Sequence, residues 1–182
     1  GASMSFGVNF GDEEPWNPAV TMPAYGVHPS RWQETVPGDE TGPINGMQSF
    51  PFGAGQIDLM WSANNTYSVP GDPDTLPTGE AQVNYGYLDD GGSGYSVLVY
   101  GLVNGLGYSR YVVRTIAASD NAANFAPVTL SDNVNFTNYT LTYPAVGPAN
   151  PSGGKAAFST VSPVLSADSI TLASIREGTT LT

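Results

Sequence analysis

The sequence predicts an all-β domain, an antiparallel β-sandwich of the jelly-roll kind with little helix. Apolar and polar residues alternate over 4–10, 56–62 and 133–143, which is typical of strands with one buried face. Segments rich in glycine, proline, asparagine and aspartate separate these runs, and such residues favour turns. No helical period extends beyond two turns. Short alternating runs with turns between them are typical of sandwiches and jelly rolls.

The segment 94–116 predicts a central hairpin. Its two runs, 95–102 and 108–116, are rich in valine, tyrosine and isoleucine, which suit a pleated surface. Asn104 and Gly105 lie between the runs, and Asn-Gly in this position is a strong short-range hairpin signal. We therefore expect the two runs to pair with each other.

Further strands are expected on both sides of this hairpin. They are 4–10, 56–62, 81–88, 133–143, 156–160 and 169–175. Residues 11–55 carry seven prolines and no sustained period, so we expect one long loop, a feature that often serves binding. Residues 117–130 are expected to form a loop with one helical turn at 122–125.

Length and composition predict a single domain. The chain has 182 residues, 40% of them hydrophobic, which is enough to bury a core. We expect the remnant of an expression tag at 1–3, the sandwich at 4–176, and a tail or the start of a linker at 177–182.

The chain is acidic and has no cysteine. Sixteen Asp and Glu against five Lys and Arg give a formal charge of −11, which disfavours nucleic acid and anionic membranes as partners. The lack of cysteine excludes disulfides, thiol catalysis and cysteine-bound zinc. No apolar run approaches the ~20 residues that membrane insertion requires. These features favour a bacterial protein that is secreted or held at the cell surface.

Several stretches, taken in order, resemble one family of secreted bacterial β-sandwich domains. The stretches are FGVNF at 6–10, GVHPSRW at 26–32, WSANNTY at 61–67, YGYLD at 85–89 and YSVLVY at 95–100. The family occurs in planctomycete and verrucomicrobial exported proteins that carry sorting signals. Its domains look like galactose-binding jelly rolls and carbohydrate-binding modules. The resemblance implies this fold, export and an accessory role, and it brings no catalytic motif to this sequence.

Aromatic residues in loops are the candidate ligand-binding residues. Sugar recognition uses flat aromatic faces together with polar groups that bind hydroxyls, and loops display such residues on a rigid scaffold. The candidates are the aromatic Trp16, Tyr25, Trp32 and Tyr67 and the polar Asn17, Gln33 and Asn64. We expect loops 11–55 and 63–80 to form the binding face together. Each aromatic has an alternative role as a packing residue, which for Trp32 means anchoring the long loop on the core.

A different environment is expected for Trp61. It lies in phase with Ile57 and Leu59 in the alternating run 56–62. Residues two apart in a strand share one face. We therefore expect Trp61 in the core.

Four aspartates are candidate ligands for one structural calcium ion. Asp72 and Asp74 lie in a Gly/Pro loop, and Asp89 and Asp90 precede two glycines. Calcium takes several oxygen ligands, and jelly-roll modules that hold calcium provide an analogy. Acidic turns exposed to solvent explain the same residues without an ion.

Signals for catalysis are weak. A glycosidase needs two carboxylates that flank a cleft, and Glu34 and Asp58 are the least turn-like candidates. His28 is the only histidine and lies outside any nucleophile-elbow motif. We therefore expect a non-catalytic carbohydrate-binding module, part of a larger exported protein, that recognises a neutral polysaccharide of the β-glucan, xylan or mannan type. The alternatives are a structural or adhesive domain of a bacterial surface protein and, third, a glycoside hydrolase.

Overall fold

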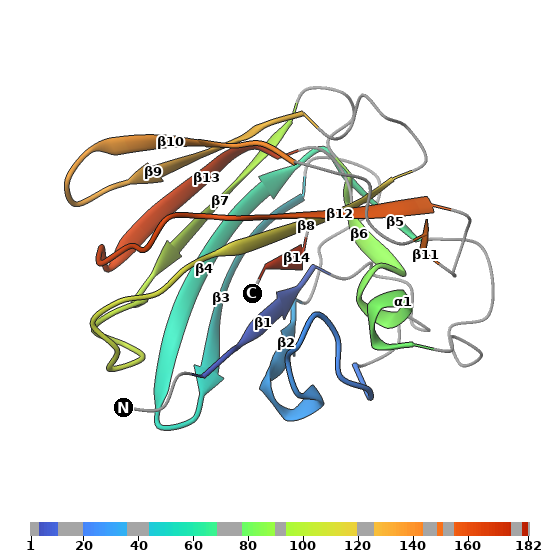
Figure 1. Cartoon of the computed structure of the whole chain (residues 1–182), viewed down its shortest axis with the longest axis horizontal. Coiled ribbons are helices and arrows are strands. Elements are labelled where there is room, and N and C mark those ends of the chain that lie inside the picture. Colours follow the sequence, from blue (N-terminus) through green and yellow to red (C-terminus); the bar gives the residue numbers. More distant parts are fainter. Residues whose placement is uncertain are drawn as a thin grey trace.

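The protein, seen here in a computed structural model, consists mainly of two six-stranded sheets, which confirms the predicted all-β sandwich (Figure 1). The described residues are 4–10, 20–35, 44–68, 78–89, 94–119, 126–143, 149–150, 155–175 and 180–181. Helix within these ranges is limited to the 3-10 turn η1 (Pro29–Arg31) and the helix α1 (Gly79–Val83). The expectation of little helix therefore holds for the described part of the chain.

The first sheet, called sheet 1 below, is antiparallel throughout. Its strands in spatial order are β10 (Thr137–Leu141), β9 (Val128–Asp132), β13 (Ser169–Ile175), β7 (Tyr95–Tyr100), β4 (Gly55–Ala63) and β3 (Ile44–Phe52). β3 and β4 pair over nine positions and form one side of the sheet.

The second sheet, called sheet 2, is antiparallel except where β1 pairs with β2. Its strands in spatial order are β11 (Ala149–Asn150), β12 (Lys155–Val161), β8 (Arg114–Ser119), β14 (Thr180–Leu181), β1 (Gly7–Asn9) and β2 (Trp32–Glu34). A separate pair joins β5 (Asn65–Ser68) to β6 (Gly86–Asp89). After β7 the chain crosses repeatedly between the two sheets, as it does in a jelly roll, with β9 and β10 together in sheet 1 and β11 and β12 together in sheet 2.

The core lies between the sheets and follows the alternation seen in the sequence. Ile57, Leu59 and Trp61 of β4 are buried, whereas the residues between them face outward. The Trp61 side chain is only 4% exposed and meets the ring of Phe10 edge-on, with centroids 5.9 Å apart. The prediction that Trp61 belongs to the core is confirmed.

The predicted central hairpin is wrong, because its two runs lie in different sheets. β7 pairs with β4 and β13, whereas β8 pairs with β12 and β14. Residues 101–107 form a compact turn in which Gly105 N donates to the carbonyl of Gly101 and Gly107 N donates to that of Val103. Gly101 and Gly107 both have positive φ, and a Cβ built on Gly105 would overlap the carbonyl of Gln56. These glycines therefore permit the compact turn through which the chain crosses from sheet 1 to sheet 2.

The strand expected at 81–88 is also wrong over its first half. Residues Gly79–Val83 form α1, and only Gly86–Asp89 form a strand, β6. Thr78 caps the helix, because its side chain accepts a hydrogen bond of 3.1 Å from Ala81 N. This N-cap outweighs the alternation of apolar residues that follows.

The expected loop 11–55 contains regular structure in its described part. It includes η1, β2 and the whole of β3. The turn into β4 follows, where Gly53 has a φ of 64°. Pro51 suggests a loop but lies in β3. This strand is at the edge of sheet 1, and its described pairing is with β4 alone. Proline is tolerated on such an edge because it lacks only the amide donor.

The remaining strands match their predictions with shifted ends. β13 has the expected bounds, β4 and β12 are each slightly longer, and β1 is shorter. In the run 133–143 only β10 is a strand, because Asp132 accepts hydrogen bonds from the amides of Val134 and Asn135 and starts a turn. The region 117–130 includes the end of β8 and the start of β9, and the helical turn expected at 122–125 lies outside the described residues.

The expected tail also contributes to the fold. Within it, Thr180–Leu181 form β14, which lies between β8 and β1 in sheet 2.

Candidate functional site

Two of the aromatic candidates are packed in a small cluster beside α1. Trp32 is 7% exposed, packs with Ala24 and Val83, and donates from Nε1 to the carbonyl of Val27 over 3.2 Å. Trp32 therefore anchors its segment on sheet 2, which was its alternative role. Its ring offers no open face for stacking.

The second of these aromatics, Tyr25, is half-buried and packs against the same cluster. Its hydroxyl accepts a 2.6 Å hydrogen bond from Asn84 Nδ2, and its amide donates to Glu80 Oε1 over 3.1 Å. Burial raises the pKa of Tyr25 to about 12. The residue thus ties segment 20–35 to α1.

The polar candidates are described only in part. Gln33 donates from Nε2 to the carbonyl of Pro51 over 3.2 Å, and Asn64 is exposed. Trp16 and Asn17 lie outside the described residues, and of Tyr67 only the backbone in β5 is described. The meeting of loops 11–55 and 63–80 stays a prediction.

The calcium site also stays a prediction. Asp72, Asp74 and Asp90 lie outside the described residues, and for Asp89 only the backbone is described. The described part of the chain holds no group of three His, Asp or Glu that could bind a metal, but none of these four side chains belongs to that part.

The outer face of sheet 1 presents an aromatic ring among polar side chains. Ser49, Asp58, Tyr100 and Ser169 are successive partners across β3, β4, β7 and β13. Cross-strand partners lie on the same side of a sheet. Tyr100 is 42% exposed, and we call this row the tyrosine row.

The carboxylate in the tyrosine row is held by its neighbours. Asp58 Oδ1 accepts hydrogen bonds from Ser49 Oγ over 2.5 Å and from Gln56 Nε2 over 3.4 Å. These contacts orient the Asp58 carboxylate, which can accept hydrogen bonds from hydroxyl groups placed beside the Tyr100 ring. Tyr100 is not among the candidates from the sequence, because the buried and exposed tyrosines of β7 were not separated there, although Ser96 and Leu98 share the phase of Tyr100.

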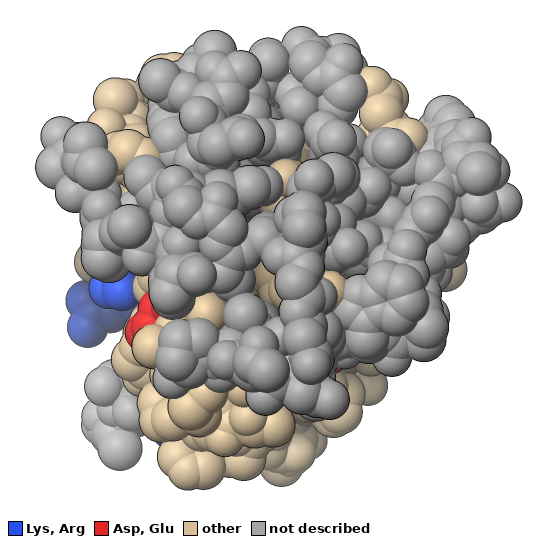
Figure 2. Space-filling view, turned by 90° about the vertical axis from the view of Figure 1, so that its right-hand side faces the viewer, with Lys and Arg blue, Asp and Glu red and all other residues tan. Residues whose placement is uncertain are grey.

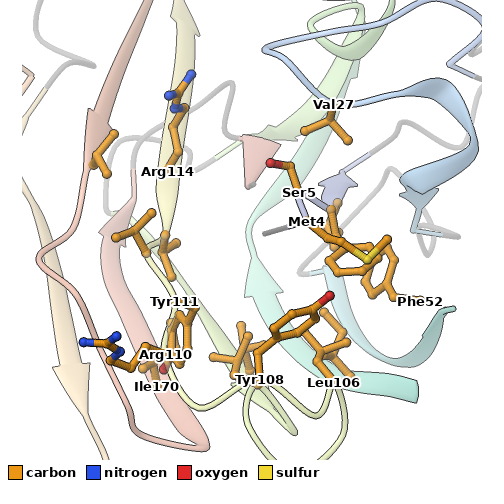
Figure 3. A pocket seen from close by; sticks show the side chains of 18 of the residues that line it. Met4, Ser5, Val27, Phe52, Leu106, Tyr108, Arg110, Tyr111, Arg114 and Ile170 are labelled. Carbon is orange, nitrogen blue, oxygen red and sulfur yellow. The ribbon is translucent and has the colours of Figure 1, made fainter. Parts of the chain in front are cut away.

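An apolar cavity of about 560 Å³ extends from the core between the sheets to the surface of sheet 2 (Figure 3). Its inner wall includes Ile57, Leu59 and Val99 of sheet 1. At its mouth lie residues before β1, residues that lead into β8, such as Arg110, and Arg114, the first residue of β8. Its volume falls within the ~300–1,000 Å³ that is usual for ligand pockets.

The two carboxylates considered for hydrolysis lie in different sheets. Glu34 is in β2, where Asn9 Nδ2 donates to its Oε1 over 3.3 Å, and burial raises its pKa to about 7. Asp58 faces outward from sheet 1. The pair therefore does not flank one cleft, as a glycosidase requires.

Charge is sparse on the described part of one face. Figure 2 views the molecule from the side that is at the right of Figure 1. The described atoms there belong mostly to uncharged residues, with a small acidic area next to a basic one. No helix in the described residues is long and apolar enough to span a membrane.

Comparison with protein-family models, curated proteins and solved structures found no match.

Proposed function

We propose that this chain is a non-catalytic carbohydrate-binding module for a neutral polysaccharide, with a binding platform on the outer face of sheet 1. Tyr100 carries the proposal. Its exposed ring lies in a row with hydrogen-bonding side chains, and this is the combination that a pyranose ring requires.

The chemistry of the tyrosine row favours a neutral sugar. One face of the Tyr100 ring can stack on C–H groups, while the Asp58 carboxylate and the Ser49 hydroxyl oxygen can accept hydrogen bonds from sugar hydroxyls. The net charge of −11 opposes binding of a polyanion, whereas a β-glucan, xylan or mannan carries no charge to repel. Export and a bacterial source remain part of this proposal and rest on the resemblance of the sequence.

Affinity electrophoresis in gels that contain a soluble β-glucan, xylan or mannan tests the proposal. The parent chain should be retarded by at least one of these gels, and Tyr100→Ala should lose about tenfold in affinity because one stacking contact contributes on the order of 1–2 kcal/mol. Phe136→Ala is the matched control, since Phe136 is 84% exposed in the β9–β10 turn, outside the tyrosine row. An equal loss of affinity in both variants would contradict the assignment of the binding platform to the tyrosine row.

The loop aromatics remain candidates for the same function. Trp16→Ala and Tyr67→Ala should weaken retention if loops 11–55 and 63–80 extend the platform. Should these variants lose binding while Tyr100→Ala retains it, the site lies in the loops instead of the sheet.

A structural or adhesive domain is the second candidate. It is favoured by exposed apolar side chains on sheet 1: Phe136 at 84% and Val134 at 55% in one turn, and Met47 at 77% on β3. Phe136 and Val134 lie at one edge of sheet 1 and Met47 at the opposite edge, so the candidate interaction site is the turn, because exposed apolar groups mark interaction sites where they are contiguous. Failure of the parent to bind any of the three polysaccharides would favour this function.

A further inference from the structure

An apolar row of side chains lies next to the tyrosine row on the outer face of sheet 1. Met60 of β4 pairs with Met47 of β3 and with Leu98 of β7, the strands on either side of β4 (Figure 1). Residues two apart in a strand share a face, so Met60 lies on the same face as Asp58, and Leu98 on the same face as Tyr100. We call the three apolar residues the methionine row.

A third row, which is polar and uncharged, follows at the next outward positions. Ser62 of β4 pairs with Asn45 of β3 and with Ser96 of β7, and all three residues are exposed. We call them the serine row. The three rows lie about 7 Å apart along the strands, at ~3.4 Å per residue, and the methionine row is in the middle.

An open hollow of about 520 Å³ lies over the methionine and serine rows. All six residues of the two rows line the hollow, and none of its lining residues is charged. The hollow begins one row away from Tyr100, so it adjoins the platform of the proposed function.

The fold does not account for the exposure of the methionine row. Met47 is 77% exposed and Met60 43%, and both lie on the face of the sheet that is turned away from the core. Burial of these side chains therefore contributes little to stability. Contiguous exposed apolar side chains that are bordered by polar ones mark binding surfaces.

We propose that the hollow binds the O-acetyl groups of an acetylated neutral polysaccharide whose sugar ring stacks on Tyr100. This inference rests on the proposed function and narrows its ligand to chains that carry acetyl esters, such as an acetylated xylan or mannan. The methyl group of the ester contacts the methionine row. The carbonyl oxygen of the ester accepts a hydrogen bond from the serine row.

The chemistry of the methionine row disfavours a second, bare sugar ring. Stacking on a pyranose requires a flat aromatic face, which neither methionine nor leucine provides. A hydroxyl placed over the row would exchange water for side chains that form weak hydrogen bonds or none, and burial of an unpaired polar group is unfavourable. An acetyl methyl group has no hydrogen bond to lose, and flexible thioether side chains can pack around it.

The serine row suits the other half of the ester. A carbonyl oxygen only accepts hydrogen bonds, and the hydroxyls of Ser62 and Ser96 and the amide of Asn45 can donate them. The acetyl ester is also uncharged. The net charge of −11 therefore does not oppose its binding, whereas it opposes an acidic substituent such as a carboxylate or a sulfate.

Isothermal titration with paired oligosaccharides tests the inference. The probes are acetylated xylo- and manno-oligosaccharides and the same preparations after mild alkaline deacetylation, so each pair differs only in the ester. The parent chain should bind at least one acetylated probe about tenfold more tightly than its deacetylated form, because the buried methyl group and one additional hydrogen bond both contribute.

Substitutions in the methionine row locate the acetyl group. Met60→Gln introduces a polar group of similar length and should abolish the preference for the acetylated probe without weakening binding of the deacetylated one. Met47→Gln should act in the same way, whereas Met60→Leu remains apolar and should retain the preference. Met4→Gln is the matched control, because Met4 is 42% exposed and lies outside the hollow.

Two further measurements complete the test. Tyr100→Ala should weaken binding of both members of a pair equally, because the sugar ring is common to them. Unchanged melting temperatures show that the variants remain folded.

Other results would overturn the inference. Equal binding of the two members of each pair would remove the acetyl group from the site and leave the proposed function intact. A preference that survives in both Met60→Gln and Met47→Gln would place the acetyl group elsewhere. Dimerisation of the parent that Met47→Gln abolishes would assign the methionine row to a second copy of the chain. If no probe binds while a polysaccharide gel still retards the parent, only this inference fails; if the gels fail as well, the proposed function fails with it.

Discussion

The backbone amide of Asn104 donates a 2.7 Å hydrogen bond to Oδ1 of Asp168. The same oxygen accepts from the amide of Val103 over 3.0 Å, and Leu102 N donates to the Asp168 carbonyl over 3.1 Å. Asp168 precedes β13, so a residue 64 positions later in the chain holds the turn that carries the chain from sheet 1 to sheet 2.

Asp168→Ala should destabilise the fold by about 1.5–3 kcal/mol, because two backbone amides lose a charged acceptor. The denaturant midpoint from urea unfolding measures the change. Asp168→Asn retains one carbonyl oxygen as an acceptor and should lose less stability than Asp168→Ala. If the alanine variant unfolds at the parent's midpoint, the turn does not depend on this carboxylate.

Glu34 should make stability fall with rising pH. Its pKa is about 7 in the folded protein against 4.5 for an ordinary carboxyl, because burial disfavours the charged form. The folded state then binds this proton more tightly than the unfolded state does. The stabilisation is fully present below about pH 4.5 and is lost as pH rises through about 7.

Thermal melts from pH 4.5 to 8 measure this effect. The difference corresponds to at most about 3 kcal/mol at ~1.4 kcal/mol per pH unit, and partial solvent screening reduces it. Glu34→Gln keeps an acceptor for Asn9 Nδ2 and should flatten the pH dependence. A variant whose melting temperature falls as steeply as that of the parent would show that another group is responsible.

Trp61 and Gly46 should be energetically coupled. They pair across β3 and β4, and a Cβ built on Gly46 would overlap the indole ring. Trp61→Ala should cost about 3–5 kcal/mol, as deletion of a buried large aromatic does. Gly46→Ala should be destabilising in the parent and much less so in the Trp61→Ala background, because the ring that it meets is gone. Additive losses in a double-mutant cycle would contradict this steric relation.

The core strands could be predicted from the sequence because their information is local. In β4, and in β13 as far as Leu172, the side chains alternate between core and solvent, and this period is visible without the partner strands. The crossing at 101–107 could not be predicted in the same way. Asn104-Gly105 fits a hairpin, and the choice of a crossing depends on Asp168, which is distant in the sequence.

The candidate site was less predictable than the fold. Trp32 and Tyr25 are residue types that suit sugar binding. Their packing roles depend on hydrogen bonds to Val27 and Asn84, which form only in the folded chain. Tyr100 becomes a candidate only when β7 is placed between β4 and β13, because its polar neighbours come from β3, β4 and β13.

A structural calcium ion would make thermal stability depend on calcium. If Asp72, Asp74, Asp89 or Asp90 bind the ion, added calcium raises the melting temperature and a chelator lowers it, by mass action on the folded state. Elemental analysis of the purified protein detects a calcium ion that is bound too tightly for a chelator to remove. A metal-free protein whose melt is insensitive to calcium would contradict the prediction.

Asp58 should contribute to glycan affinity without contributing much to stability. Its carboxylate lies beside Tyr100 in the tyrosine row and is oriented by Ser49 and Gln56. Asp58→Ala removes an acceptor for a sugar hydroxyl, and a charged hydrogen bond contributes about 1.5–3 kcal/mol, so affinity should fall about tenfold or more. Isothermal titration with the best oligosaccharide measures this loss. Ser131→Ala on the same outer face, next to Thr171 and Asn138 and away from the tyrosine row, is the control and should bind as the parent does. If Asp58→Ala binds as tightly as the control, the carboxylate does not contact the sugar, and the platform is reduced to the ring of Tyr100.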